Sequence, residues 1–79
     1  MRKTLSELVA ERLRAEMAIQ QIKASELAKR LGVSHMYVTR RMTSETSIDL
    51  RELEAIAGAL NISPARLLAG VLDAERVSV

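Results

Sequence analysis

The chain has 79 residues, a net charge of +2, one aromatic side chain and no cysteine. Its length suits a single domain, residues 1–79, and the lack of cysteine excludes disulfides and thiolate metal sites. No apolar run approaches the roughly 20 residues that span a bilayer, and Met1-Arg2-Lys3 is followed by Glu7 rather than by the apolar core of a signal peptide, so we expect an intracellular protein.

A first helix is predicted over residues 4–20. Thr4 and Glu7 have the spacing of a capping box, in which each side chain binds the backbone N–H of the other residue. Apolar residues then recur every three or four positions, which indicates the buried stripe of an amphipathic helix. The residues expected in this stripe are Leu5, Leu8, Val9, Leu13 and Met17. Residues 20–23 break the stripe and are expected to form a connection, with Ile22 pointing inward.

Two short helices follow, over Ala24–Leu31 and His35–Met42. Gly32 is expected to end the first of them, because glycine readily adopts the left-handed conformation that closes many helices. Ser34 can cap the second through its hydroxyl. The side chains expected to be buried around the pair are Leu27, Ala28, Leu31, Val33 and Val38. A helix pair joined by a short glycine-containing turn is typical of the helix-turn-helix motif, here residues 24–43.

The rest of the chain predicts two more helices after a polar loop at residues 43–47. Asp49, with an acidic residue three positions on, is a second cap, and its helix ends near Asn61. The expected buried side of that helix consists of Leu50, Leu53, Ile56, Ala57 and Leu60. Ser63-Pro64 is a strong start signal for a fifth helix, which covers at least Pro64 to Ala69. The predicted fold class is therefore all-α, one compact unit of five helices.

Charge is unevenly distributed along the chain. Residues 23–41 carry five basic side chains and one acidic one, whereas residues 42–79 carry three basic and six acidic ones. Positive charge gathered on one segment of a nearly neutral chain favours a polyanionic partner.

Four fragments of the chain share the order and spacing of one family: Arg14–Met17, Glu26–Ser34, Tyr37–Arg41 and Leu53–Ser63. Together they resemble the lambda-repressor-like helix-turn-helix family, which includes phage Cro and repressor proteins, over residues 5–69. The resemblance implies a five-helix fold, sequence-specific binding of double-stranded operator DNA, regulation of transcription as a repressor or Cro-like protein, and no cofactor. It also implies that the protein is located in the cytoplasm of a bacterial or phage-infected cell, bound to DNA.

The chain departs from the pattern of that family in three places. Lys23 and Ala24 stand where the second helix usually begins with Thr or Ser and then Gln, which often helps to orient a phosphate and a recognition side chain. Ser44 stands where the loop often has glycine. Met17 and Met42 replace a buried Arg and Glu of many relatives, and a buried ion pair can be exchanged for apolar residues without loss of stability. We therefore predict that Met17 and Met42 touch.

The outward face of the His35–Met42 helix is predicted to read base edges in the major groove, which is about 12 Å wide. The predicted base-reading residues are His35, Met36, Thr39, Arg40 and Thr43. Arg40 suits the two acceptors of a guanine, and Thr39 or Met36 suits a thymine methyl group. The predicted phosphate contacts are Lys23, Ser25, Tyr37, Arg41 and Ser47, together with exposed amides at the start of the second helix.

Each of these assignments has a plainer alternative. A lone histidine such as His35 is more often a surface residue than a contact, and Met36 can belong to the core. Arg41 can pair with Glu45 one turn on, in a surface salt bridge that never touches DNA. Two further basic residues are expected to face solvent rather than phosphate: Lys29 and Arg30.

A homodimer is expected, because members of this family usually bind half-sites about one helical turn apart. The fifth helix carries apolar residues on two sides, and residues 77–79 alternate like a short strand. We expect residues 66–79 to form the interface, with Gly70 arguing against a continuous helix there. The predicted interface residues are Leu67, Val71, Leu72, Val77 and Val79.

Other functions stay open at this point. An antitoxin or a recombination accessory factor would also bind DNA, whereas a protein-binding module would use the same fold without DNA. An enzyme is not expected, because one histidine, no cysteine, no glycine-rich phosphate loop and no convergent carboxylates offer nothing to build a site from. No metal site, small-molecule ligand or membrane partner is expected either.

Overall fold

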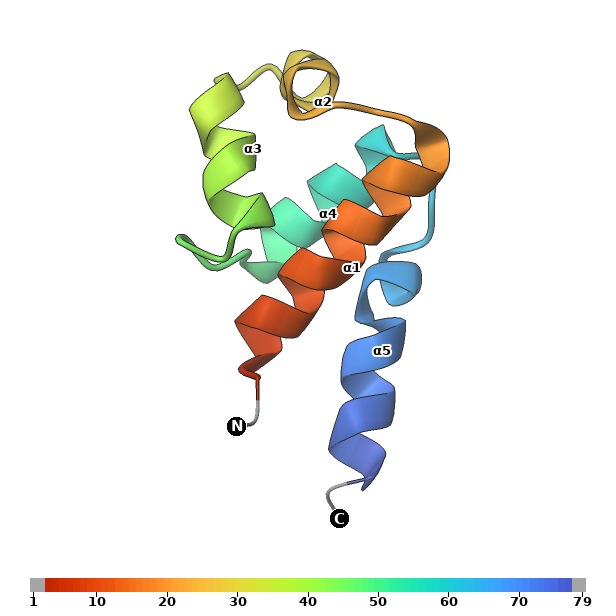
Figure 1. Ribbon diagram of the computed structural model, residues 1–79. Coiled ribbons are helices and arrows are strands. Elements are labelled where there is room, and N and C mark those ends of the chain that lie inside the picture. The colour runs from red at the N-terminus through yellow and green to blue at the C-terminus, as the bar shows by residue number, and fades with distance from the viewer. Residues whose placement is uncertain (1–2, 78–79) are drawn as a thin grey trace.

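The computed structural model describes residues 3–77, and the side chains of residues 3–69 and 71. In chain order the described residues form α1 (Leu5–Gln20), α2 (Ala24–Leu31), α3 (His35–Met42), α4 (Leu50–Ala59) and α5 (Pro64–Val77), with no strand among them (Figure 1). The all-α, five-helix prediction is confirmed, and so are the predicted bounds of α2 and α3. None of these helices combines the length and apolar character needed to span a bilayer.

Predicted caps set where three of the helices begin. The Thr4 hydroxyl accepts from the Glu7 amide at 3.1 Å, and the Glu7 carboxylate accepts from the Thr4 amide at 2.8 Å. Asp49 and Glu52 form a second capping box before α4, with distances of 2.7 and 3.1 Å. The Ser34 hydroxyl accepts from the amide three residues on, at 3.1 Å. These side chains satisfy amide groups that have no partner within the helix, which fixes the first residue of each helix.

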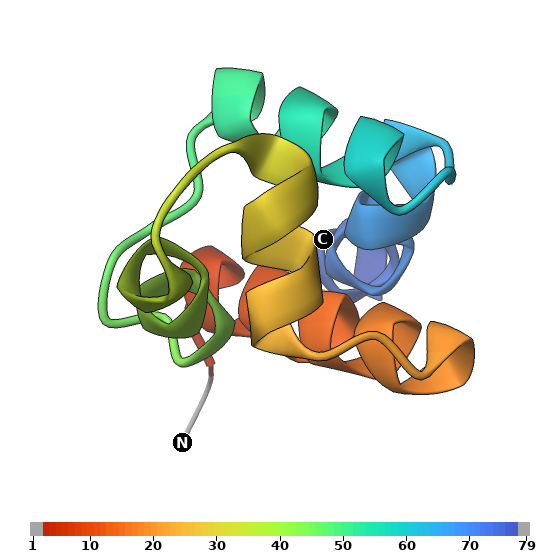
Figure 2. The same ribbon diagram turned by 90° about the horizontal axis from the view of Figure 1, so that it is seen from above.

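The core lies where α1, α4 and α5 meet the α2–α3 pair. α1 packs against α5 and α3, and α4 packs against α2 and α5. Seen from above, α2 crosses the space between α1 and α4, with α3 to one side (Figure 2). The largest fully buried apolar side chains are Leu13, Leu27, Val38, Leu60 and Leu67. Ile22 packs against this core, so its predicted inward placement is confirmed. Met17 belongs to the core and Met42 packs against it, and the contact between the two methionines stays a prediction.

Two leucines predicted to be buried are exposed instead. Leu5 is 51% exposed and Leu50 is 76% exposed, although the rest of both apolar stripes faces the core. Each is the first residue of its helix. Side chains on a helix tilt toward its amino end, so those of the first residue project past the helix rather than onto its packed face.

The last helix is longer than the sequence indicated. α5 runs from Pro64 through Gly70 to Val77, and in Figure 1 its last turns project beyond the other helices. Gly70 therefore does not interrupt the helix, and Val77 ends a helix rather than beginning a strand. Ser78 and Val79 lie outside the described residues.

The predicted dimer interface is contradicted at two of its five residues. Leu67 and Val71 are buried within the single chain, where they form part of the core between α1, α4 and α5. Both residues are therefore covered by their own chain and not by a second copy, and only a small part of Val71 reaches the surface, where it lines an apolar groove. The side chains of Leu72, Val77 and Val79 lie outside the described part of the chain.

A buried carboxylate ties α1 to α5. Glu16 is 1% exposed and accepts from Arg12 Nη2 at 2.9 Å and from Arg66 Nε at 3.0 Å. Arg12 Nε also donates to the Arg66 carbonyl at 3.1 Å. Burial of a charge is tolerated only when it is paired, so this network fixes how α5 lies on α1. Local spacing in the sequence could not reveal it, because Glu16 and Arg66 are 50 positions apart.

Candidate nucleic-acid interface

One face of α3 is open to solvent and the other packs into the molecule. Four of the five predicted base-reading residues are exposed, and Thr39 is partly exposed: the exposed ones are His35, Met36, Arg40 and Thr43. Met36 is 51% exposed, so the alternative that it belongs to the core is wrong. On the opposite side Val38 is buried and Met42 packs against the core. α3 therefore presents a mostly polar surface on a helix that is held from behind.

The turn before α3 depends on Gly32. Its φ of +70° closes α2, and the Val33 amide donates back to the Ala28 carbonyl at 3.0 Å. A Cβ atom at position 32 would meet no heavy atom within 4 Å, so it is the backbone conformation and not crowding that requires glycine. Ser34 then starts α3 at once, which leaves little freedom in the angle between the two helices.

The carboxyl end of α3 is held by three groups. Arg14 on α1 donates a hydrogen bond to the Met42 carbonyl. The Thr43 hydroxyl donates to the Thr39 carbonyl at 3.1 Å. The Thr46 amide donates to the Arg40 carbonyl in the last turn of α3, also at 3.1 Å. With both ends fixed, the outward side chains of α3 keep a defined position.

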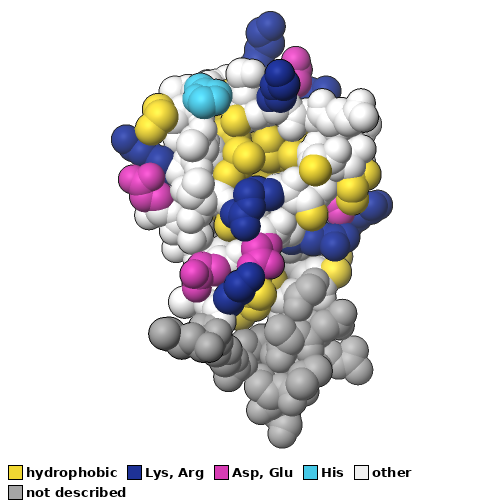
Figure 3. Space-filling model, in the orientation of Figure 1, with side chains coloured by type: hydrophobic (Ala, Val, Ile, Leu, Met, Phe, Trp, Pro, Cys, Tyr) yellow, Lys and Arg dark blue, Asp and Glu magenta, His cyan; other side chains and the backbone are white. Residues whose placement is uncertain are grey.

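Basic side chains lie at both ends of α2, Lys23 at its start and Lys29 and Arg30 in its last turn, just before α3. Figure 3 shows Lys and Arg side chains around the end of the molecule formed by α2 and the start of α3, where the histidine also lies. Lys23 occupies the N-cap position of α2 without a side-chain capping bond, and Ser25 in the first turn is exposed. An uncapped helix start of this kind attracts anions such as phosphate. Ser47, in the loop before α4, is also exposed and accepts from the Ser6 hydroxyl at 3.1 Å.

The remaining two predicted phosphate contacts, Tyr37 and Arg41, lie in a half-buried cluster with Glu52 of α4. The Tyr37 hydroxyl and Arg41 Nη2 both donate to Glu52 Oε2, each at 2.7 Å. The guanidinium carbon of Arg41 lies 3.5 Å from the centre of the Tyr37 ring. Only 12% of the Arg41 side chain and 19% of the Glu52 side chain are exposed.

The cluster stabilises the charged forms of its carboxylate and guanidinium. The hydrogen bond from Arg41 is the main reason why the pKa of Glu52 falls to about 2. The same bond raises the pKa of Arg41 above its ordinary value. Burial, and then the bond to Glu52, raise the pKa of Tyr37, so this hydroxyl keeps its proton and donates.

The sequence alternative that paired Arg41 with Glu45 is wrong, because the partner of Arg41 is Glu52. The sequence predicts Glu52 only as the capping partner of Asp49, a role that its other oxygen does fill. The one signal in the sequence was the four-residue spacing of Tyr37 and Arg41, which places both on one side of α3. The two basic residues expected to face solvent are exposed: Lys29 and Arg30.

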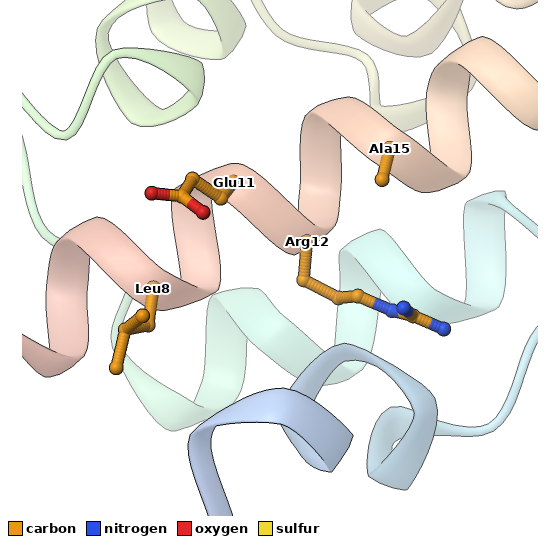
Figure 4. A pocket seen from close by; sticks show the side chains of 4 residues that line it. All are labelled: Leu8, Glu11, Arg12 and Ala15. Atoms are coloured by element: carbon orange, nitrogen blue, oxygen red, sulfur yellow. The ribbon is translucent and has the colours of Figure 1, made fainter. Parts of the chain in front are cut away.

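Two hollows of about 250 Å³ each lie away from α3. One lies on α1 and is lined by Leu8, Glu11, Arg12 and Ala15 (Figure 4). The other is an apolar groove among α1, the loop before α4, α4 and α5, lined by Leu5, Ser6, Val9, Ile48, Leu50, Leu53, Leu68 and Val71. Among the described residues no three His, Cys, Asp or Glu side chains gather as metal ligands. The expectation that the chain is not an enzyme stays a prediction.

Comparison with known proteins gives three findings. A family model described as helix-turn-helix matches residues 11–67. Repressor protein C2 of Salmonella phage P22 is 34% identical over 73 residues, which cover 92% of this chain and 34% of that protein, so the chain spans about a third of the length of this relative. The crystal structure of the clp gene regulator ClgR from C. glutamicum is similar in fold, with a TM-score of 0.85, 23% identity and coverage of 92% of this chain and 95% of that one.

The family match spans α1 from residue 11 onward, the α2–α3 pair, α4 and the start of α5, which are the elements that position the exposed face of α3. The resemblance found in the sequence is thereby confirmed. The chain belongs to the lambda-repressor-like helix-turn-helix family of DNA-binding domains.

Proposed function

We propose that the protein regulates transcription by binding double-stranded operator DNA, in the manner of a phage repressor or Cro-like protein, with α3 in the major groove. The observation that carries this proposal is the outward face of α3, where Met36 is 51% exposed beside the exposed Arg40. An exposed methionine on a helix fixed at both ends suits contact with base edges and thymine methyl groups.

Within this proposal, one set of residues contacts bases and another set contacts phosphates. Arg40 is the residue suited to grip a guanine, at about 1–3 kcal/mol of discrimination. The side chains proposed to contact bases are His35, Met36, Thr39, Arg40 and Thr43. Lys23, Ser25 and Ser47 are proposed to contact phosphates, because they are exposed at the start of α2 and in the loop after α3. Tyr37 and Arg41 are left out of this set, because Glu52 holds both of them.

The test is binding of the protein to a random-sequence duplex at several salt concentrations, followed by selection of the preferred sequence from a random pool. We expect binding at low salt that weakens steeply as salt rises, since several phosphates are neutralised. Arg40→Ala should abolish the preference at one base-pair position. Lys29→Ala, which removes the same charge from an exposed site on α2, should keep the preference at every position.

Two results would count against the proposal. Undetectable binding to any duplex at low salt would favour a protein-binding module that uses the same fold. Binding that weakens equally at all positions in Arg40→Ala would make Arg40 a phosphate contact rather than a base reader.

We propose further that two copies bind adjacent half-sites, with the apolar groove between α1, α4 and α5 as their contact. Leu50 is 76% exposed at the edge of this groove and Leu5 is 51% exposed beside it. Exposed leucines around an apolar groove are an unfavourable surface for a single chain, and a second copy would cover them. Operators with two half-sites about one helical turn apart bind one copy of a recognition helix at each half-site, which is the geometric reason for a second copy of the same chain.

Leu50→Asp tests this contact, with Ile19→Asp as its matched control. Ile19 is 65% exposed on α1 and does not line the groove, so both changes place one charge on an exposed apolar residue. Sedimentation should show a dimer for the unchanged chain and for Ile19→Asp, and a monomer for Leu50→Asp. A monomer for all three proteins, both free and on DNA, would contradict the dimer.

A further inference from the structure

The link between α3 and α4 is made by side chains and not by close packing of the two helices. No Cα atom of residues 35–42 lies within 8 Å of a Cα atom of residues 50–59. Three long side chains cross this gap, those of Tyr37 and Arg41 from α3 and that of Glu52 from α4. Glu52 is itself fixed, because its second oxygen accepts from the Asp49 amide at 3.1 Å at the start of α4.

The hydrogen bonds from Tyr37 and Arg41 to Glu52, called the bridge from here on, give two neighbouring arginines of the same charge different surroundings. Arg40 is exposed, whereas Arg41 is 12% exposed, lies over the Tyr37 ring and donates one bond to the Tyr37 carbonyl at 3.1 Å and another to Glu52. The Arg41 Nε atom is buried and has no hydrogen-bond partner among the described residues. The whole guanidinium group is therefore turned into the protein and away from the exposed face of α3.

We propose that Glu52 is a positioning residue for DNA recognition: it fixes the rotation of α3 and keeps Arg41 off the phosphate backbone, so that Arg40 alone of the two arginines reaches DNA. This inference rests on the proposed function. An arginine released beside the recognition surface would bind the phosphates of any sequence, which strengthens non-specific binding. Glu52 thereby acts on specificity without touching DNA.

The test compares Glu52→Gln with Glu54→Gln in binding to a random-sequence duplex over a range of salt concentrations. Both variants remove one negative charge from α4, and glutamine at position 52 keeps the capping role. Glu54 is exposed and forms no ion pair among the described residues, so Glu54→Gln controls for net charge alone.

The expected result is a change in the dependence of binding on salt. Glu52→Gln should make the slope of log K against log salt more negative by about 0.9, which corresponds to one additional phosphate contact. Glu54→Gln and Arg41→Met should keep the slope of the unchanged protein. The double variant Glu52→Gln with Arg41→Met should return to that slope, because the released arginine is then missing.

Two outcomes would overturn the inference while the proposed function stands. One is an equal slope for the two glutamine variants. The other is a slope less negative by about 0.9 in Arg41→Met, which would place Arg41 on a phosphate in the complex. Failure of the unchanged protein to bind any duplex at low salt would instead overturn the proposed function, and this inference with it.

A second measurement checks the bridge in the free protein. Tyr37 is the single tyrosine of the chain, so the absorbance of tyrosinate during an alkaline titration reports on this residue alone. Glu52→Gln should lower the pKa of Tyr37 toward its ordinary value, whereas Glu54→Gln should leave it unchanged. A Tyr37 pKa that is the same in all three proteins would mean that the bridge does not form, and would overturn the inference.

Discussion

At the scale of single residues, the surroundings of a side chain decide its role more than its type does. Arg40 and Arg41 are neighbours with the same charge, yet one is exposed and the other is held by Tyr37 and Glu52. The sequence could place both on α3 and predict which residues face outward. It could not show that Glu52 would reach Arg41, because that depends on where α4 lies in the folded chain.

The first prediction concerns the acid stability that Glu52 provides. Its pKa is about 2 in the folded protein, below the ordinary 4.5, so its stabilising contribution is present above the ordinary value and is lost as the pH falls toward 2. Between pH 7 and pH 3 the unchanged protein should lose about 2 kcal/mol more of its unfolding free energy than Glu52→Gln does. Urea unfolding at both pH values measures this difference. An equal loss in the two proteins would contradict it.

The second prediction compares two glycines that have the same open space on the side where a Cβ atom would lie but differ in backbone conformation. Gly32 has a φ of +70°, whereas Gly58 lies in α4. Gly32→Ala should lower the unfolding free energy by about 1–2 kcal/mol, because alanine is strained in the left-handed region. Gly58→Ala should raise it by about 0.5–1 kcal/mol through better helix propensity. Chemical denaturation of both variants is the measurement, and a change of the same sign in both would refute this explanation.

At the scale of helices, the caps explain why so much could be predicted. Thr4, Ser34 and Asp49 each supply a side-chain acceptor at the start of a helix, and the structure shows all three in that role. The continuation of α5 through Gly70 could not be predicted from such local signals. Glycine costs about 1 kcal/mol in a helix relative to alanine, and the burial of Val71 directly after it outweighs that cost.

The sequence also could not predict that the apolar residue at the start of a helix is exposed. The apolar spacing placed Leu5 and Leu50 with the buried residues that follow them, but a spacing does not show where the packed part of a helix begins. The same limit applies to the fifth helix. Its apolar residues Leu67 and Val71 were expected to bind a second copy, and the structure places them in the core of the single chain.

The third prediction concerns the loop that follows α3. Ser44 has a φ of +60°, which accounts for the glycine that often stands there in the family. Ser44→Gly should raise the unfolding free energy by about 0.5–1 kcal/mol, because glycine adopts this conformation without strain. Asn61→Gly is the control, since Asn61 has a φ of +62° and asparagine tolerates this region. Thermal unfolding should show the larger gain for Ser44→Gly, and an equal or smaller gain would contradict this account of the loop.

At the scale of the whole molecule, contacts between distant parts of the chain hold the recognition helix in place. Glu16 joins α1 to α5 through Arg66, and Glu52 joins α4 to α3 through Arg41. The sequence predicted the five helices, the helix-turn-helix and the exposed face of α3, because each of these follows from local spacing. It missed both carboxylate networks, because their partners come together only when the helices pack.

The central claim is that the exposed face of α3 lies against DNA bases. The most direct test is NMR of the protein with ¹³C-labelled methionine methyl groups, of which the chain has four, during titration with its selected duplex. We expect the methyl group of Met36 to shift and to show contacts to base protons or thymine methyl groups of the major groove, whereas the buried Met17 stays unchanged. Tight binding of the duplex with no change at Met36 would contradict the claim.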